Sequence, residues 1–312
     1  MRPFAFVFPG QGSQSVGMLD AWGDHPAVRH TLEEASEALS EDLGRLIREG
    51  PKEALELTTN TQPVMLAAAI ACLAAWRAEG GPEPVAVAGH SLGEYSALVA
   101  AGALRFADAL PLVRHRAQAM QQAVPVGEGA MAAILGLEAA AVKTVCEAVA
   151  AETGEVVSPA NFNDPKQTVI AGAKAAVDLA CEKLKAAGAK RALPLPVSAP
   201  FHCALMKPAA KRLRERLAEV PLVAPRIAVV NNIDVAVQTD PAAIREALYR
   251  QAFGPVRWVE VVQALGARGV GHLFECGPGK VLAGLVKRID GNLASGTLLD
   301  PASLAELKGA LQ

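Results

Sequence analysis

Short apolar runs that end in Gly or Asn alternate along the chain with longer stretches of helical periodicity. The apolar runs are FAFVFPG at 4–10, VAVAGH at 85–90, RIAVVNN at 226–232 and VGHLFECG at 270–277. The helix-like stretches between and after them include PVMLAAAIACLAAW, residues 107–122 and VLAGLVKRI. This alternation is typical of parallel strands joined by crossover helices. We therefore expect an α/β fold in which both ends of the chain contribute strands to one parallel sheet.

The middle of the chain follows a different order of elements. From about Gly129 the pattern predicts a strand, a helix, two strands separated by a turn at NDPK, a second helix and a fourth strand. The order β-α-β-β-α-β is the ferredoxin-like arrangement. We therefore predict an inserted ferredoxin-like subdomain at 127–197, and a large α/β domain built from residues 1–126 and 198–312.

Composition and charge exclude several classes of protein. The 312 residues are 51% hydrophobic but only 4% aromatic, which suits helices packed closely on a buried sheet. A chain of this size buries a full core without disulfides. The formal net charge of -2 provides no global positive field for a nucleic-acid backbone. The five cysteines are widely spaced with no CxxC pair, so we expect reduced thiols and no metal site.

The apolar segments predict a protein that does not contact a membrane. Pro9 and Gly10 interrupt the N-terminal apolar run, which is too short for a secretory signal. The most apolar segment, VMLAAAIACLAAW, has about 13 residues before Arg77, fewer than the roughly 20 that a membrane span needs. We therefore expect a buried helix in a cytoplasmic protein.

The stretch GHSLG at 89–93 places Ser91 between two glycines directly after a predicted strand. It fits G-x-S-x-G, the strand-to-helix turn whose glycines allow a cramped bend that exposes the serine hydroxyl. The helix-like stretch that follows has free N–H groups at its start, which favour developing negative charge. The alternative is that Ser91 only caps this helix. The context favours a nucleophile.

A serine nucleophile needs a base, and the chain offers six histidines. His202 lies in VSAPFHCALM, where a strand-like segment breaks at Pro200 and a helix begins. Loops at strand ends are where α/β sheets carry their chemistry, although a histidine without a catalytic role remains the alternative. The neighbouring Cys203 is expected to be a packed thiol. The other histidines are expected to be solvated, to pack in a helix or strand, or to steady the serine turn; they are His25, His30, His90, His115 and His272.

A second Gly-rich stretch, FPGQGSQ at 8–14, follows the first predicted strand. Its glycines let main-chain N–H groups approach a ligand closely, as an oxyanion hole requires, and Gln11 would supply one such group. Taken alone, the stretch is only a Gly-rich turn, and an ordinary loop is the favoured interpretation.

Seven motifs follow one another along the chain. They are FPGQGSQ, NTQPVM at 60–65, GHSLGEYSAL at 89–98, LVRHRAQAM at 112–120, NFNDPKQTVIAG at 161–172, VSAPFHCALMKP at 197–208 and FECGPGKVL at 274–282. Together they resemble the malonyl-CoA:acyl carrier protein transacylase family over nearly the whole chain. The resemblance implies an α/β hydrolase-like core with a parallel sheet and an inserted ferredoxin-like α+β subdomain.

The resemblance also implies the catalytic residues. Ser91 would be acylated and His202 would be its base. The family uses a carbonyl or amide group rather than a carboxylate to orient the histidine, which points to Gln251 and departs from the Ser, Asp or Glu, His order of α/β-hydrolases. The main-chain N–H groups of Leu92 and Gln11 would form the oxyanion hole.

The specificity residue implied by LVRHRAQAM is Arg116, which the spacing of the motif selects over Arg114. A guanidinium group can hold the free carboxylate of a malonyl group through two hydrogen bonds. Gln62 and Asn161 are candidate pocket residues. Phe201 is bulky beside the base, and we expect it to crowd a branched acyl group such as methylmalonyl.

The implied reaction needs no cofactor or metal. Malonyl-CoA would acylate Ser91, and a monomeric enzyme would then transfer malonyl to the phosphopantetheine thiol of an acidic acyl carrier protein. Candidate docking residues for this carrier are Lys190 and Arg191 or the run KPAAKRLRER, each of which is equally consistent with a solvated face. A serine hydrolase and an inactive carrier-binding protein are the competing hypotheses, and the pathway, fatty acid or polyketide, stays open.

Overall fold

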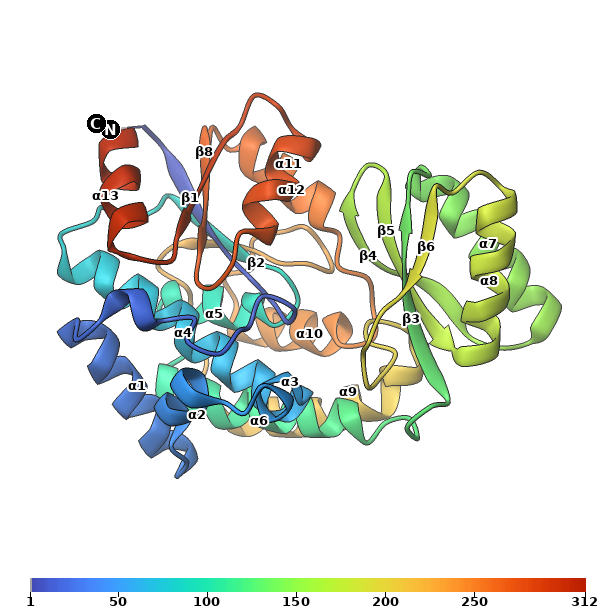
Figure 1. The fold of residues 1–312 in the computed structure, drawn as a ribbon, viewed down its shortest axis with the longest axis horizontal. Helices are drawn as coiled ribbons and strands as arrows, with labels where there is room; N and C mark the ends of the chain where they lie inside the picture. The colour runs from blue at the N-terminus through green and yellow to red at the C-terminus, as the bar shows by residue number, and fades with distance from the viewer. Residues whose placement is uncertain (1) are drawn as a thin grey trace.

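The computed structural model describes residues 2–312 and contains two separate β-sheets, each covered by helices (Figure 1). The first sheet has five strands in the order β7-β2-β1-β8-β9, and every neighbouring pair is parallel. Its strands are β1 (Phe4–Phe8), β2 (Ala86–Gly89), β7 (Ala228–Val230), β8 (His272–Cys276) and β9 (Ala294–Leu298). The predicted parallel sheet with strands from both ends of the chain is therefore confirmed.

The central strand β1 shows why the apolar runs are continuous. All five residues of FAFVF are buried, because helices cover both faces of the sheet. Phe4, Phe6 and Phe8 belong to the core on one face, whereas Ala5 and Val7 belong to the core on the other. Alternate residues of a strand point to opposite faces, so each face receives its own apolar set.

Helices from different parts of the chain cover the two faces of the first sheet. On the phenylalanine face, the core includes residues of α1, α2, α4, α5, α6, α9, α10 and α13, and on the other face it includes residues of α11 and α12. The bounds are α1 (Pro26–Leu39), α2 (Leu43–Glu49), α3 (Lys52–Glu56), α4 (Thr58–Ala78), α5 (Gly93–Ala100), α6 (Phe106–Gln121), α9 (Lys207–Glu219), α10 (Pro241–Gln251), α11 (Trp258–Ala267), α12 (Val281–Ile289) and α13 (Pro301–Ala310). Two short 3₁₀ helices are η1 (Asp20–Trp22) and η2 (Ala204–Met206).

The helix α4 is longer than the apolar run that predicted it. It begins at Thr58, continues through Pro63 and has 21 residues, so the prediction of a helix too short to span a membrane is wrong as to length. Among residues 2–312 it is the one helix long and apolar enough to do so by length and composition alone. Most of it is buried inside the protein, and its Trp76 ring packs edge-on against Phe6 with centroids 5.4 Å apart. α4 is therefore a core helix.

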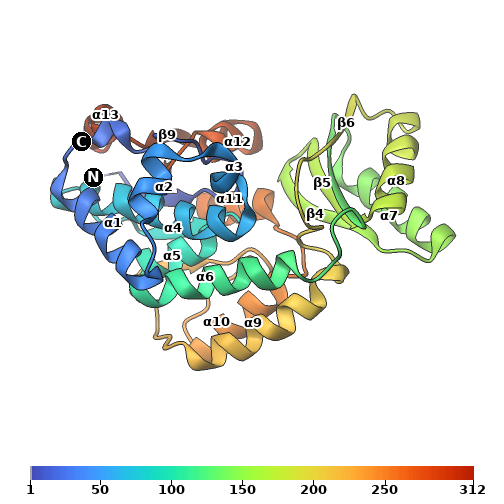
Figure 2. The same ribbon diagram turned by 60° about the horizontal axis from the view of Figure 1, so that its bottom comes forward.

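The second sheet is antiparallel and has the strand order β4-β5-β3-β6. It contains β3 (Gly129–Leu135), β4 (Val157–Asp164), β5 (Gln167–Ala173) and β6 (Arg191–Pro194), with α7 (Ala139–Thr153) and α8 (Lys174–Ala186) packed on it. Figure 2 shows these elements standing to one side of the larger α/β part. The predicted β-α-β-β-α-β order is confirmed, while the domain limits at 127 and 197 stay a prediction.

A short extended segment at Val256 joins the second sheet to the part of the structure that contains the first sheet. The Phe162 N–H in β4 donates to the Val256 carbonyl, and the Val256 N–H donates to the Ala160 carbonyl, both over 2.9 Å. On the same strand, Asp164 pairs with Arg288 of α12 over 2.8 Å. These contacts fix the β4 edge of the second sheet against the segment at Val256 and against α12.

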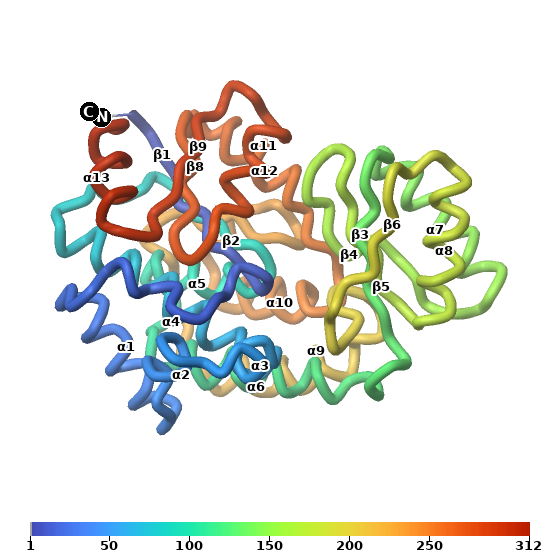
Figure 3. The backbone as a smooth tube through the Cα atoms, viewed as in Figure 1, coloured from blue at the N-terminus to red at the C-terminus, as the bar shows by residue number. Residues whose placement is uncertain are grey.

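The last strand and helix were not expected from the sequence. β9 has the sequence ASGTL, with Ala294 exposed and only Leu298 buried, so it lacks the apolar run that identified the other strands. The tube in Figure 3 shows that α13 brings the end of the chain back beside the start of β1.

Substitution of Gly93 at the start of α5 should destabilise the fold. A Cβ at this position would lie 2.1 Å from the Phe8 carbonyl oxygen of β1, so the helix and the strand would have to separate. We expect Gly93→Ala to lower the free energy of unfolding by about 3 kcal/mol. In the control, Gly284→Ala, the Cβ of the exposed α12 residue meets nothing within 4 Å. That change should raise stability by about 0.5–1 kcal/mol. Denaturant unfolding of both variants checks this, and equal stabilities would contradict it.

Candidate active site

Ser91 occupies a sharp turn between β2 and α5. Its φ of 53° lies in the left-handed region, which costs energy for a residue with a side chain. The flanking glycines are required sterically, because a Cβ at Gly89 would lie 1.9 Å from the Gly93 carbonyl group. The five-residue pattern predicted from the sequence therefore forms a strand-turn-helix bend that presents the Ser91 hydroxyl.

His202 lies directly against this hydroxyl. Its Nε2 is 2.6 Å from Ser91 Oγ, and its Nδ1 lies 2.9 Å from the carbonyl oxygen of Gln251 and 3.2 Å from that of Gly254. Because both of these groups are acceptors, Nδ1 must carry the proton, and Nε2 is then free to accept from the serine. His202 also has a positive φ, 62°.

Burial keeps this histidine neutral. The side chain is nearly inaccessible, and burial, together with the nearby Arg116 cation, lowers the pKa of His202 to about 3. A neutral imidazole at neutral pH is the form that can accept a proton from a serine hydroxyl. The pair is therefore in the protonation state that nucleophilic attack requires.

Arg116 of α6 is the third group at the serine. Its guanidinium donates to Gln62 Oε1 over 2.7 Å, and its Nη2 lies 3.2 Å from both Ser91 Oγ and Gln251 Oε1. Only 2% of Arg116 is exposed, these acceptors carry no charge, and its Nε has no partner among residues 2–312. Burial lowers the pKa of Arg116. A buried cation with neutral acceptors favours a ligand that brings a carboxylate.

The two candidate arginines of α6 thus have different environments. Arg114 is partly buried, with 16% of its side chain exposed, and pairs with Glu41 over 2.5 Å, whereas Arg116 points at Ser91. The geometry agrees with the choice of Arg116 that the motif spacing implied.

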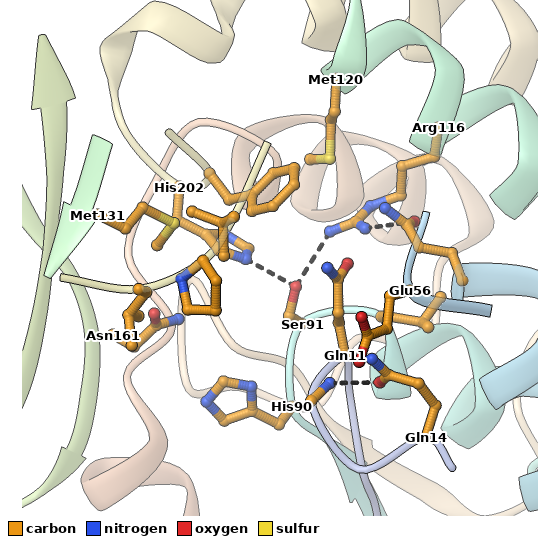
Figure 4. A pocket seen from close by; sticks show the side chains of 17 residues that line it. Gln11, Gln14, Glu56, His90, Ser91, Arg116, Met120, Met131, Asn161 and His202 are labelled. Atoms are coloured by element: carbon orange, nitrogen blue, oxygen red, sulfur yellow. Dashed lines mark hydrogen bonds between the residues drawn. The ribbon is translucent and has the colours of Figure 1, made fainter. Parts of the chain in front are cut away.

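A cavity of about 480 Å³ opens in front of these groups (Figure 4). It lies between the first part of the structure and the second sheet, because both contribute its walls. Its lining residues are Gln11, Gly12, Gln14, Glu56, Gln62, His90, Ser91, Leu92, Arg116, Met120, Met131, Asn161, Leu195, Pro196, Val197, Phe201 and His202. All predicted site residues except Gln251 line this cavity, and Gln251 lies behind it, buried. The fourth strand of the subdomain was expected to reach residue 197, but β6 ends at Pro194. The Leu195 N–H still donates to the Met131 carbonyl over 2.9 Å, and the segment 195–197 forms one wall of the cavity.

Gln11 and Leu92, whose main-chain N–H groups are predicted for an oxyanion hole, both line this cavity. Within residues 2–312 neither the Gln11 N–H nor the Leu92 N–H has a hydrogen-bond acceptor. The Gln11 side chain is held by Thr58, whose hydroxyl donates to Gln11 Oε1 over 2.5 Å. Leu92 precedes the first residue of α5, so its N–H lies at the positive end of a helix.

Two polar residues that support the turn were missed in the sequence. The Asn232 side chain accepts from the Ser91 N–H and donates to the Gly89 carbonyl, both over 2.7 Å. Glu94 accepts from the Asn232 N–H over 2.9 Å. The signals were present, since Asn232 directly follows a predicted strand and Glu94 follows the serine motif, but nothing in the sequence indicates that these two segments meet.

His90 and Cys203, the other two candidates beside the site, make hydrogen bonds that support the surrounding structure. His90 Nε2 lies 2.8 Å from Asn163 Oδ1 in β4, so it steadies the turn as expected. The buried Cys203 thiol donates to the Pro200 carbonyl over 3.1 Å, and burial raises its pKa to about 11, which leaves it a poor nucleophile. Within residues 2–312 no cluster of three or more His, Cys, Asp or Glu side chains could hold a metal ion.

Comparison with known proteins identifies the family. The acyl transferase domain family matches residues 5–288. A malonyl CoA-acyl carrier protein transacylase of Salmonella typhimurium is 55% identical, with 98% of each chain covered. An acyl-carrier-protein S-malonyltransferase structure from Burkholderia pseudomallei has a TM-score of 0.96 at 66% identity, covering 98% of this chain and 99% of the other. A malonyl-transacylase solved in complex with a type II PKS acyl-carrier protein has a TM-score of 0.95 at 51% identity, covering 97% and 98%.

The α/β fold and the matched domain define this protein as an acyltransferase. Within that class, the chain belongs to the family of malonyl CoA-acyl carrier protein transacylases. The resemblance expected from its seven motifs is confirmed.

The low pKa of His202 predicts an unusual pH profile for Ser91. Because the folded-state pKa of about 3 lies below the ordinary 6.5, His202 stays neutral and able to accept the serine proton as the pH falls through that range. The rate at which phenylmethylsulfonyl fluoride modifies Ser91, followed by intact mass, should therefore hold nearly constant through pH 6.5 and fall only at much lower pH. A rate that halves near pH 6.5 would contradict this assignment.

Proposed function

We propose that this enzyme transfers malonyl from malonyl-CoA to the phosphopantetheine thiol of an acyl carrier protein through a malonyl-Ser91 intermediate, by a ping-pong mechanism without a cofactor. The observation that carries the proposal is the position of Ser91 Oγ, 2.6 Å from His202 Nε2 and 3.2 Å from Arg116 Nη2. A nucleophile, its base and a carboxylate-binding cation thus meet at one atom. The names of the related transacylases support the choice of substrate and partner.

In the first half-reaction, Ser91 Oγ attacks the thioester carbonyl and its proton passes to His202 Nε2. The carbonyl oxygen becomes an oxyanion, and the unpaired N–H groups of Gln11 and Leu92 are the donors proposed to stabilise it. The tetrahedral intermediate then breaks its carbon–sulfur bond, and the proton on His202 goes to the departing CoA sulfur. The carrier thiol reverses these steps, losing its proton to His202 as it attacks the malonyl-Ser91 ester.

Gln251 is the proposed orienting residue for the histidine, and it acts through its main-chain carbonyl. Since His202 Nδ1–H donates to that oxygen, the ring is held with Nε2 toward the serine. The bond to this carbonyl raises the pKa of His202, but burial and the Arg116 cation outweigh it and keep the pKa low. The low pKa suits a base that must also return its proton to a thiolate leaving group.

Arg116 is the proposed selectivity residue. A malonyl carboxylate would satisfy its buried cation, whereas an acetyl group would leave the cation unpaired. Charged hydrogen bonds contribute roughly 1.5–3 kcal/mol each, so the expected preference for malonyl is on the order of a hundredfold or more. Gln62 would orient the guanidinium through the 2.7 Å bond.

Asn161 and Phe201 are proposed to shape the acyl pocket. Asn161 of β4 lines the cavity from the second sheet, and Phe201 lines it beside the base. The ring of Phe201 is proposed to crowd a branch at C2 of the acyl group, which would favour malonyl over methylmalonyl.

The docking surface for the acidic carrier stays a prediction. Lys190 and Arg191 are exposed at the start of β6, and β6 leads into the segment 195–197 at the cavity wall. In the alternative run on α9, Arg214 and Arg216 already pair with Glu246 and Glu219, which reduces the net positive charge there. The charges therefore favour Lys190 and Arg191.

Replacement of the nucleophile should abolish the intermediate. Brief exposure to malonyl-CoA should add a malonyl-sized mass to the wild-type protein and none to Ser91→Ala, because only the hydroxyl can form the ester. Intact-mass measurement reports the adduct, and adding carrier protein should remove it. Free malonate without any adduct would indicate a hydrolase instead, and an adduct on Ser91→Ala would place the nucleophile elsewhere.

Removal of the buried Arg116 cation should weaken the preference for malonyl-CoA over acetyl-CoA. Arg116→Ala should lower kcat/KM for malonyl-CoA by about a hundredfold and leave acetyl-CoA much less affected, because acetyl has no carboxylate. Arg114→Ala, two residues away on the same helix, is the matched control and should leave the ratio of the two kcat/KM values unchanged. An unchanged ratio for Arg116→Ala would refute the assigned role.

A further inference from the structure

Glu94 is a buried carboxylate to which the proposed reaction assigns no role. It lies in the first turn of α5, three residues after the nucleophile, and is 2% exposed. One of its oxygens, Oε2, accepts two hydrogen bonds, from the Asn232 main-chain N–H over 2.9 Å and from Gln251 Nε2 over 3.0 Å. A carboxylate is costly to bury unless such bonds compensate it.

The first of these partners holds the serine turn. Asn232 bonds the main chain on both sides of His90, at the Gly89 carbonyl and at the Ser91 N–H. Both bonds are 2.7 Å long, and Asn232 is completely buried. Because the turn at Ser91 is strained, its geometry depends on partners that are themselves held in place. Glu94 holds the main chain of Asn232 from the opposite side.

The second partner touches all three proposed functional groups. Gln251 Nε2 donates to the Ser91 carbonyl over 3.0 Å, Oε1 accepts from Arg116, and its main-chain carbonyl accepts from His202. The side-chain amide can keep this orientation only if its NH₂ group has acceptors. Glu94 Oε2 is one of the two acceptors that the structure supplies.

We infer that Glu94 is a positioning residue of the transfer reaction, whose Oε2 holds Asn232 and Gln251 and through them keeps Ser91, His202 and Arg116 at working distances. This inference rests on the proposed function, because the alignment matters only if Ser91, His202 and Arg116 carry out the transfer. Glu94 itself contacts none of the reacting atoms. Three segments that are distant in the sequence meet at this oxygen: α5, the loop after β7 and the end of α10. Arg116 of α6 is linked to it through Gln251.

The position of the acceptor oxygen, and not its charge, is what this role requires. Burial raises the pKa of Glu94 to about 7, while bonds from Gln251 and Asn232 and the Arg116 cation lower it and Asp234 raises it. Tyr95 and His202 are the other titratable groups near Arg116 and Ser91. A carboxylate, a carboxylic acid and an amide can all present one carbonyl-type oxygen to two N–H donors. Variants that separate position from charge therefore test the inference.

Two substitutions make this separation. Glu94→Gln keeps an acceptor oxygen in place but removes the charge, whereas Glu94→Asp keeps the charge but withdraws the oxygen by one methylene. Since a misplacement of about 1 Å in a site can cost up to a hundredfold, we expect Glu94→Asp to lower kcat by about tenfold or more and Glu94→Gln by about threefold. Glu94→Asp should also weaken the preference for malonyl-CoA over acetyl-CoA, because Arg116 loses its alignment.

That preference is the decisive readout. The ratio of the two kcat/KM values does not depend on how much of a sample is folded, so a merely structural loss would not move it. Glu275 provides the matched control: it is completely buried, its pKa is raised to about 7, and its Oε2 accepts the Ala283 N–H over 2.9 Å at the start of α12. Glu275→Gln and Glu275→Asp should keep the wild-type ratio.

The outcomes separate this inference from the proposed function. A wild-type ratio in Glu94→Asp, or a loss in Glu94→Gln as large as in Glu94→Asp, would overturn the positioning role. A wild-type enzyme that forms no malonyl adduct would instead count against the Ser91 intermediate. The expected order, with wild type above Glu94→Gln and Glu94→Asp lowest in both kcat and preference, would establish that the oxygen acts through alignment.

Discussion

The close approach of α5 to β1 and β2 is the constraint on which the rest of the site depends. A Cβ at Gly89 or Gly93 would overlap main-chain atoms, so the chain can turn at Ser91 only in the left-handed conformation with glycines on either side. That bend places the serine hydroxyl at the carboxyl edge of the parallel sheet, where loops from several strands converge. Every other functional group is positioned relative to this turn.

Buried hydrogen bonds hold the strained turn at Ser91 in place. Asn232 and Gln251 satisfy the main chain around Ser91, and Glu94 satisfies both of them. Such a network must be fully paired, because an orphaned group in a medium of low polarity costs more than a lost apolar contact. The same burial lowers the pKa of His202 and leaves the Arg116 cation shielded from water, so that an anionic ligand would stabilise it. A single property, burial, thus prepares the base and the cation together.

The second sheet completes the cavity without touching the serine itself. Met131, Asn161 and the segment 195–197 form the wall opposite the first sheet, and the pairing of β4 with Val256 holds that wall near Gly254 and His202. The bond between His90 and Asn163 links the serine turn directly to β4. A ligand in this cavity would therefore contact residues from the elements around both sheets.

The sequence by itself determined the parts of this protein that depend on local chemistry. The apolar runs located eight of the nine strands found among residues 2–312, G-x-S-x-G located the nucleophile candidate, and the motifs indicated the family. The edge strand β9 was missed because its half-exposed ASGTL carries no apolar signal. The motifs also implied His202 and Arg116 as partners of Ser91, whereas only the tertiary structure decided that Glu94 accepts hydrogen bonds from both Asn232 and Gln251. These are contacts between residues more than a hundred positions apart or on different elements, and no local pattern encodes a distance that only the packing of helices and sheets creates.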